Sequence, residues 1–104
     1  MKEHKRHIER DDLKGATHLE VSVFYDKGGA NYFSGGTTQR GYYLSVRPVT
    51  KSDRMVSFVM FAGKKRFLLE TARFSQKQLD RAVELAKAHE DELIAAVVAE
   101  NKAA

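Results

Sequence analysis

The last thirty residues of the chain carry its strongest structural signal, a stripe of apolar residues at helical spacing. Ser75 and Gln78 form an S-x-x-Q capping box, in which each side chain can satisfy a free backbone N–H of the first helical turn. The stripe, which Glu90 interrupts, predicts one helix from Gln76 to about Asn101 that lies on a sheet. Its members are Leu79, Ala82, Val83, Ala86, Leu93, Ile94 and Val97.

Two segments upstream of this helix alternate between apolar and polar residues, the pattern of β-strands with one buried face. Residues 18–26 place Leu19, Val21 and Val23 on one face, with Phe24 as an apolar exception on the other. Residues 42–49 alternate in the same way. Pro48 cannot donate a ladder hydrogen bond, which favours an edge strand or the end of a strand.

Two further strands are expected at residues 55–61, which are almost entirely apolar, and at residues 66–73. The sequence thus predicts an α+β fold, in which an antiparallel sheet of about four strands, in β-β-β-β-α order, is packed by one long C-terminal helix. A chain of 104 residues is the size of one domain. We place that domain at residues 16–104 and expect residues 1–15, which are charged with little to bury, to be a flexible or weakly helical tail.

The predicted helix is longer than the predicted strands. It would measure about 40 Å at 1.5 Å per residue, whereas an eight-residue strand covers only ~27 Å. Its last turns would then need another apolar surface, and we expect a homodimer formed by Leu93, Ile94, Val97 and Val98. The alternative is that these turns fray or that the helix packs diagonally.

The net charge of +4 is unevenly distributed. Residues 1–74 hold 14 Lys and Arg against 8 Asp and Glu, while residues 75–104 hold 4 against 6. Cysteine is absent, which removes disulfides and thiolate sites and is typical of a reducing compartment. No apolar stretch approaches the ~20 residues that span a bilayer. We therefore expect a cytoplasmic protein without a membrane partner.

The loop between the first two predicted strands, residues 27–41, is unusually rich in glycine, with five. It is not a phosphate-binding P-loop, because Tyr42 and Tyr43 stand where that motif needs Lys and Ser or Thr. Aromatic rings beside cations are instead typical of surfaces that bind single-stranded nucleic acid. The alternative is that Tyr32 and Phe33 close the end of the core. The candidate nucleic-acid-binding residues are Lys27, Tyr32, Phe33, Arg40, Tyr43, Arg47, Lys64, Lys65 and Arg66.

The residues that carry catalysis or bind metals do not form a recognisable constellation. His4 and His7 are three apart in the charged N-terminal segment, which is too little for a metal site. No G-x-S-x-G nucleophile elbow is present, and the acidic residues are dispersed. We expect no enzymatic activity, no catalytic residues, no cofactor and no metal.

The segments 25–33 and 40–46 resemble those of small uncharacterised proteins encoded on conjugative and other mobile elements of bacteria. The resemblance implies a bacterial cytoplasmic accessory protein and supplies no activity or functional residues. Our first hypothesis is a non-catalytic accessory protein that binds nucleic acid, single-stranded DNA or RNA in preference, through a basic, aromatic sheet face and the glycine-rich loop. The alternative is a protein-interaction module that uses the loop or a sheet edge and binds no nucleic acid.

Overall fold

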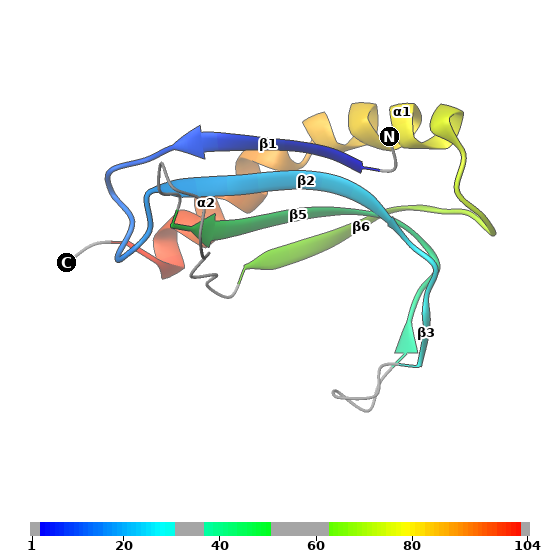
Figure 1. Ribbon diagram of the computed structural model, residues 1–104, viewed down its shortest axis with the longest axis horizontal. Coiled ribbons are helices and arrows are strands. Elements are labelled where there is room, and N and C mark those ends of the chain that lie inside the picture. Colours follow the sequence, from blue (N-terminus) through cyan, green and yellow to red (C-terminus); the bar gives the residue numbers. More distant parts are fainter. Residues whose placement is uncertain (1–2, 31–36, 51–62, 103–104) are drawn as a thin grey trace.

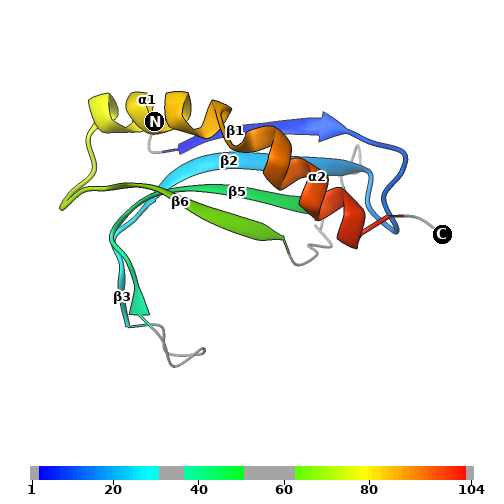
Figure 2. The same cartoon turned by 180° about the vertical axis from the view of Figure 1, so that it is seen from behind.

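The computed structural model describes residues 3–30, 37–50 and 63–102, which form a four-stranded antiparallel sheet with two helices on one of its faces (Figures 1 and 2). The strands are β1 (Glu3–Glu9), β2 (His18–Asp26), β5 (Gly41–Val49) and β6 (Lys64–Glu70), in the order β1-β2-β5-β6. The predicted α+β class and antiparallel sheet are confirmed. The predicted strand at residues 55–61 lies outside the described residues.

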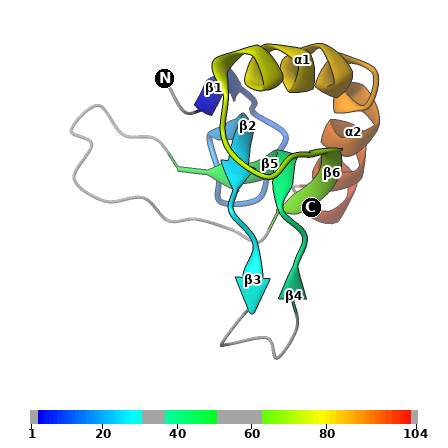
Figure 3. The same ribbon diagram turned by 90° about the vertical axis from the view of Figure 1, so that its right-hand side faces the viewer.

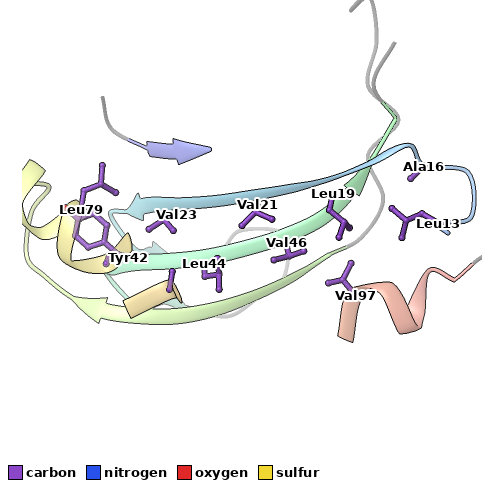
Figure 4. Close-up of a cluster of buried hydrophobic side chains, with 12 residues drawn as sticks. Leu13, Ala16, Leu19, Val21, Val23, Tyr42, Leu44, Val46, Leu79 and Val97 are labelled. Atoms are coloured by element: carbon purple, nitrogen blue, oxygen red, sulfur yellow. The ribbon is translucent and has the colours of Figure 1, made fainter. Parts of the chain in front are cut away.

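Strands β2 and β5 form the centre of the sheet, and their apolar alternation is confirmed. Their register places Val21 opposite Val46 and Val23 opposite Leu44, so one face of the pair is continuously apolar. We call this the inner face, because it packs against the helices (Figure 4). Pro48 lies near the end of β5, beyond the last residue that pairs with β6. The inner-face residues, each 4% exposed or less, are Leu19, Val21, Val23, Tyr42, Leu44 and Val46.

The N-terminal segment is not the frayed or weakly helical tail that the sequence predicts. Residues 3–9 form the edge strand β1, which pairs antiparallel with the whole length of β2 up to Phe24. Only Ile8 packs against the core, so β1 is held by backbone hydrogen bonds and ion pairs rather than by apolar burial. Charged side chains on an edge strand also discourage pairing with a further chain. The following connection adds a buried Leu13 to the core.

The predicted single helix is wrong, because two helices are present: α1 (Gln76–Lys87) and α2 (Glu90–Glu100). At the break, the N–H groups of Ala88 and His89 donate to carbonyls only three residues earlier, and the φ of His89 is −119°, far from the value of about −63° in a regular helix. The change of direction lets α2 follow the sheet (Figure 2). Val97 is fully buried in the chain's own core, and Leu93 packs against it. The argument for a dimer from helix length therefore fails.

Ser75 and Tyr42 fix the start of α1 through hydrogen bonds. The Ser75 hydroxyl accepts a hydrogen bond from the Gln78 N–H (3.2 Å), so half of the predicted capping box is formed. The other half is not, since Gln78 Oε1 is buried without a hydrogen-bond partner among the described atoms. The Tyr42 hydroxyl instead accepts from the Ser75 N–H (3.0 Å) and donates to its carbonyl (2.9 Å), which ties α1 to β5.

The predicted central loop begins and ends as a narrow arm, formed by β3 (Gly29–Ala30) and β4 (Thr37–Thr38). The arm turns away from the helices (Figures 1 and 3). The bend needs Gly28, whose φ is +72° and whose N–H donates to Asp26 Oδ1 (2.8 Å). At the arm's other base, a Cβ on Gly41 would lie 2.2 Å from the Leu69 carbonyl oxygen, so only glycine fits there.

Candidate nucleic-acid interface

The sheet face away from α1 and α2, which we call the outer face, is built from the alternate residues of the same strands. Because residues directly opposite in the ladders share a face, the register assigns its members. Figure 3 shows the helices on the other side of the sheet. The outer-face residues are Glu3, Lys5 and His7 of β1, Glu20, Ser22 and Phe24 of β2, Tyr43, Ser45 and Arg47 of β5, and Lys65 and Phe67 of β6.

One end of the outer face carries a row of aromatic rings from three neighbouring strands. The Phe24 and Tyr43 rings stack with centroids 6.0 Å apart, and Tyr43 meets the Phe67 ring edge-on at 5.4 Å. Tyr43 is buried between its neighbours, whereas Phe24 and Phe67 are half-buried. We call these three residues the aromatic row. Their two outer rings leave part of their surface free to stack with a planar ligand.

A positive charge lies beside this row. The Lys65 ammonium is 5.5 Å from the centroid of the Tyr43 ring and 6.0 Å from that of Phe24, within the range of a cation–π contact. The Tyr43 hydroxyl donates to the Gln39 carbonyl (2.6 Å) at the base of the arm. Burial, together with the negative charge of Asp26, raises the pKa of Tyr43, so its hydroxyl stays a neutral donor.

The other end of the outer face is organised by a buried carboxylate. Glu20 is 8% exposed, and its Oε1 accepts two hydrogen bonds from the Arg47 guanidinium, from Nε at 3.0 Å and Nη2 at 2.7 Å. His7 Nε2 lies 3.2 Å from Oε2, and the Lys5 ammonium is 3.9 Å from Oε1. Burial raises the pKa of Glu20, but Arg47, Lys5 and His7 more than offset this, so its pKa lies below the ordinary value. Glu20 therefore stays ionised and compensates the Arg47 charge.

The structure brings some of the predicted basic residues together and separates others. Tyr43, Arg47 and Lys65 share the outer face. Lys64 and Arg66 flank Lys65 in sequence and therefore lie on the helix side of β6, where the Lys64 ammonium pairs with Glu100 at 2.8 Å. Lys64 and Arg66 therefore do not belong to the outer face with Lys65.

Two further predicted cations stand at the base of the arm. Lys27 is exposed and lines a hollow of about 440 Å³ with Phe24, Tyr25, Asp26 and Phe74. Arg40, on the opposite branch of the arm, is exposed, and its Nη1 donates to the Ala72 carbonyl at 3.4 Å. Both positions adjoin the end of the sheet that holds the aromatic row, Lys27 next to β2 and Arg40 next to β5. Tyr32 and Phe33 lie outside the described residues.

The candidate residue set drawn from the sequence omitted Phe24, Phe67 and Glu20. Phe24 had a visible signal, since it is the one large apolar residue on the polar side of an alternating strand. Phe67 had one too, because it alternates with Lys65 along its strand. Glu20 had none, because its pairing with Arg47 depends on the register of strands distant in sequence. Among the described residues, no group of three or more His, Asp or Glu side chains could hold a metal ion. None of the helices in the described ranges is long and apolar enough to cross a membrane.

Comparisons with protein-family models, with curated proteins and with solved structures found no match to this chain.

Proposed function

We propose that the protein binds single-stranded nucleic acid across the outer face of its sheet, without catalysing a reaction. The observation that carries the proposal is the aromatic row, three rings from three adjacent strands, with the Lys65 ammonium over two of them, Phe24 and Tyr43. Bases stack on such rings without regard to sequence, which favours single strands over duplexes, whose bases are already stacked.

The charges around the row support the same partner. Lys65, Lys27 and Arg40 are exposed and lie at the end of the sheet that holds the rings. Arg47 is different, because its charge is compensated by Glu20. We therefore assign phosphate contacts to the first three and a structural role to Arg47. About three such contacts predict that log K falls with log salt at a slope of about −2 for a single strand.

Fluorescence anisotropy with a labelled oligothymidine and a matching duplex tests this proposal. Raising the salt from about 50 to about 200 mM should weaken single-strand binding about 20-fold. Phe24→Ala should weaken it about tenfold through lost stacking, while Leu85→Ala on α1, an exposed position far from the row, serves as the control. No binding at low salt, or binding that ignores Phe24→Ala, would refute the proposal.

A protein-interaction module is the second candidate, and the projecting arm of β3 and β4 favours it. In that case the arm would dock a partner protein and the oligonucleotide would not bind. A partner captured from a cell extract, retained after nuclease treatment and lost on deletion of the arm, would support this second function.

The cellular setting that we propose follows from the resemblance of segments 25–33 and 40–46 to proteins of bacterial mobile elements. It is the cytoplasm of a bacterium that carries a mobile element, where the chain acts as an accessory protein and two copies associate. Neither the setting nor the association is needed for nucleic-acid binding as such. Each can therefore fail separately from the anisotropy test.

A further inference from the structure

Between its acidic first turn and Glu100, helix α2 is apolar on all of its sides, although only one side faces the core. Residues 93–99 include no charged or polar side chain. Val97 is fully buried, but Ile94 and Val98 are only partly covered, and Ala95 and Ala99 are exposed. A helix that is apolar all round is normally buried all round. Helix α1, by contrast, is charged along its outward side.

The uncovered side of α2 forms the floor of a groove of about 540 Å³. The connection between β1 and β2 forms the opposite wall, where the Arg10 guanidinium donates to both carboxylate oxygens of Asp12, at 2.9 and 2.6 Å. The rim carries two positive and two negative charges, so it does not attract a polyanion. The lining residues are Arg10, Asp12, Asp91, Ile94, Ala95, Val98, Ala99 and Lys102.

The positions that α2 and its C-terminal end contribute to this groove are symmetric about the point between residues 96 and 97. Asp91 and Lys102 are equally far from that point, and so are Ile94 and Ala99, and likewise Ala95 and Val98. If the α2 helix of a second copy packs antiparallel against this one, with a two-fold axis at that point, the Asp91 of each copy lies beside the Lys102 of the other. This arrangement would also place each branched side chain beside an alanine, which is the complementarity of ridges packed into grooves.

We infer that this groove is the site of a second copy of the chain, with the two α2 helices antiparallel about a two-fold axis. The inference gives the proposed association a defined interface, in which Asp91 faces the partner's Lys102 and Ala95 faces the partner's Val98. Of the four residues that the sequence predicts at a dimer interface, Val97 is a core residue, and Leu93, Ile94 and Val98 are partly buried against that core. Ile94 and Val98 also line this groove, whereas Leu93 does not.

The groove presents fewer residues than the ~20–30 that each partner contributes to a stable complex. We therefore expect a weak dimer that dissociates on dilution. Sedimentation equilibrium should give a mass that rises from 11.8 kDa toward twice that value as the concentration increases to about 1 mM. Ala95→Glu should keep the chain monomeric, because it puts a charge at the centre of the contact. Leu85→Glu, at the exposed apolar position of α1, should leave the association unchanged.

Charge reversal tests the antiparallel arrangement. Asp91→Lys alone and Lys102→Asp alone should each weaken association, because each places like charges together across the axis. The double variant should restore it. Circular dichroism checks that every variant is folded.

A monomeric mass at all concentrations would overturn the inference and leave the groove to another protein. A dimer that tolerates Ala95→Glu would move the interface off α2, and a double variant that fails to restore association would exclude the antiparallel pairing. Oligonucleotide binding has no part in these measurements, so the failure of one proposal is distinguishable from the failure of the other.

Discussion

The inner and outer faces of the β2–β5 pair are made from alternate residues of the same two strands, yet they differ in every physical respect. The inner face holds apolar side chains and two tyrosines, Tyr25 and Tyr42, and the Tyr42 hydroxyl is bonded to Ser75. The outer face holds a buried, ionised Glu20 at one end and the half-free rings of the aromatic row at the other. Folding accounts for the first face. The rings of the second exceed what folding needs, which is why we place the function there.

Leu44→Ala should have the largest effect on stability. Leu44 is fully buried between the sheet and the helices, so truncation leaves a cavity and should lower the free energy of unfolding by about 2–5 kcal/mol. Urea denaturation measures this. The oligonucleotide affinity of the folded fraction should not change. A loss of that affinity would contradict the assignment of stability to the inner face and of binding to the outer face.

Phe67→Ala should lower oligonucleotide affinity more than it lowers folding stability, the reverse of Leu44→Ala. Loss of a half-exposed stacking ring should cost about 1–3 kcal/mol of binding free energy, with a smaller loss of folding stability from the broken contact with Tyr43. Anisotropy and urea denaturation on the same preparation separate the two. If stability falls and affinity does not, the row is only a second small core.

Glu20→Gln should weaken the fold and strengthen binding. The variant keeps an acceptor for Arg47 but loses the charge that compensates it, and should lower the free energy of unfolding by about 1–2 kcal/mol, since Arg47 is one-third exposed and partly screened. The outer face would gain one positive charge. Affinity for oligothymidine at low salt should therefore rise a few-fold, and a decrease would mean that Glu20 itself contacts the ligand.

The same carboxylate predicts how stability depends on pH. Its pKa in the folded protein is below the ordinary value of 4.5, so its contribution is complete above that value and is lost as the pH falls through the lower, folded pKa. Urea midpoints measured between about pH 3 and pH 7 should show a loss of stability in acid that is smaller in Glu20→Gln. Identical acid profiles would show that Glu20 is not held by Arg47, Lys5 and His7.

Lys65→Gln and Lys64→Gln form a matched pair with a smaller effect. The two lysines are neighbours on β6 but face opposite sides of the sheet. Only the first should reduce the salt dependence of binding, by about 0.7–1 in the slope of log K against log salt. Equal effects of both substitutions would mean that the ligand follows the sheet edge rather than one face.

The sequence was sufficient for features that depend on local pattern. The alternation of residues 18–26 and 42–49 predicted both central strands, and Phe24, the apolar exception on the polar face of the first, lies opposite Tyr43 on the outer face. Strand β1 could not be predicted, because its stabilising contacts come from pairing with β2 and not from its own apolar residues. The break at His89 had one signal, the interruption of the apolar stripe at Glu90, but the stripe resumes at Leu93 and so still favoured a single helix.

The pairing of Glu20 with Arg47 lies beyond local pattern too. It depends on a register between residues 27 apart, which only the folded sheet defines. The sequence grouped Lys64, Lys65 and Arg66 by proximity along the chain, although strand geometry sends alternate residues to opposite faces. Applying that alternation to β6 would have identified Lys65 and Phe67 as the outer pair.

An NMR titration of the labelled protein with oligothymidine tests the central claim most directly, because it reports which face the ligand touches. We predict that the ring protons of Phe24 and Phe67 shift most, as stacked bases impose their ring currents, and that the methyl groups of Leu44 and Val97 in the core shift little. Shifts confined to α2 or to the helix side of β6, or no shifts at low salt, would contradict the assignment of nucleic-acid binding to the outer face.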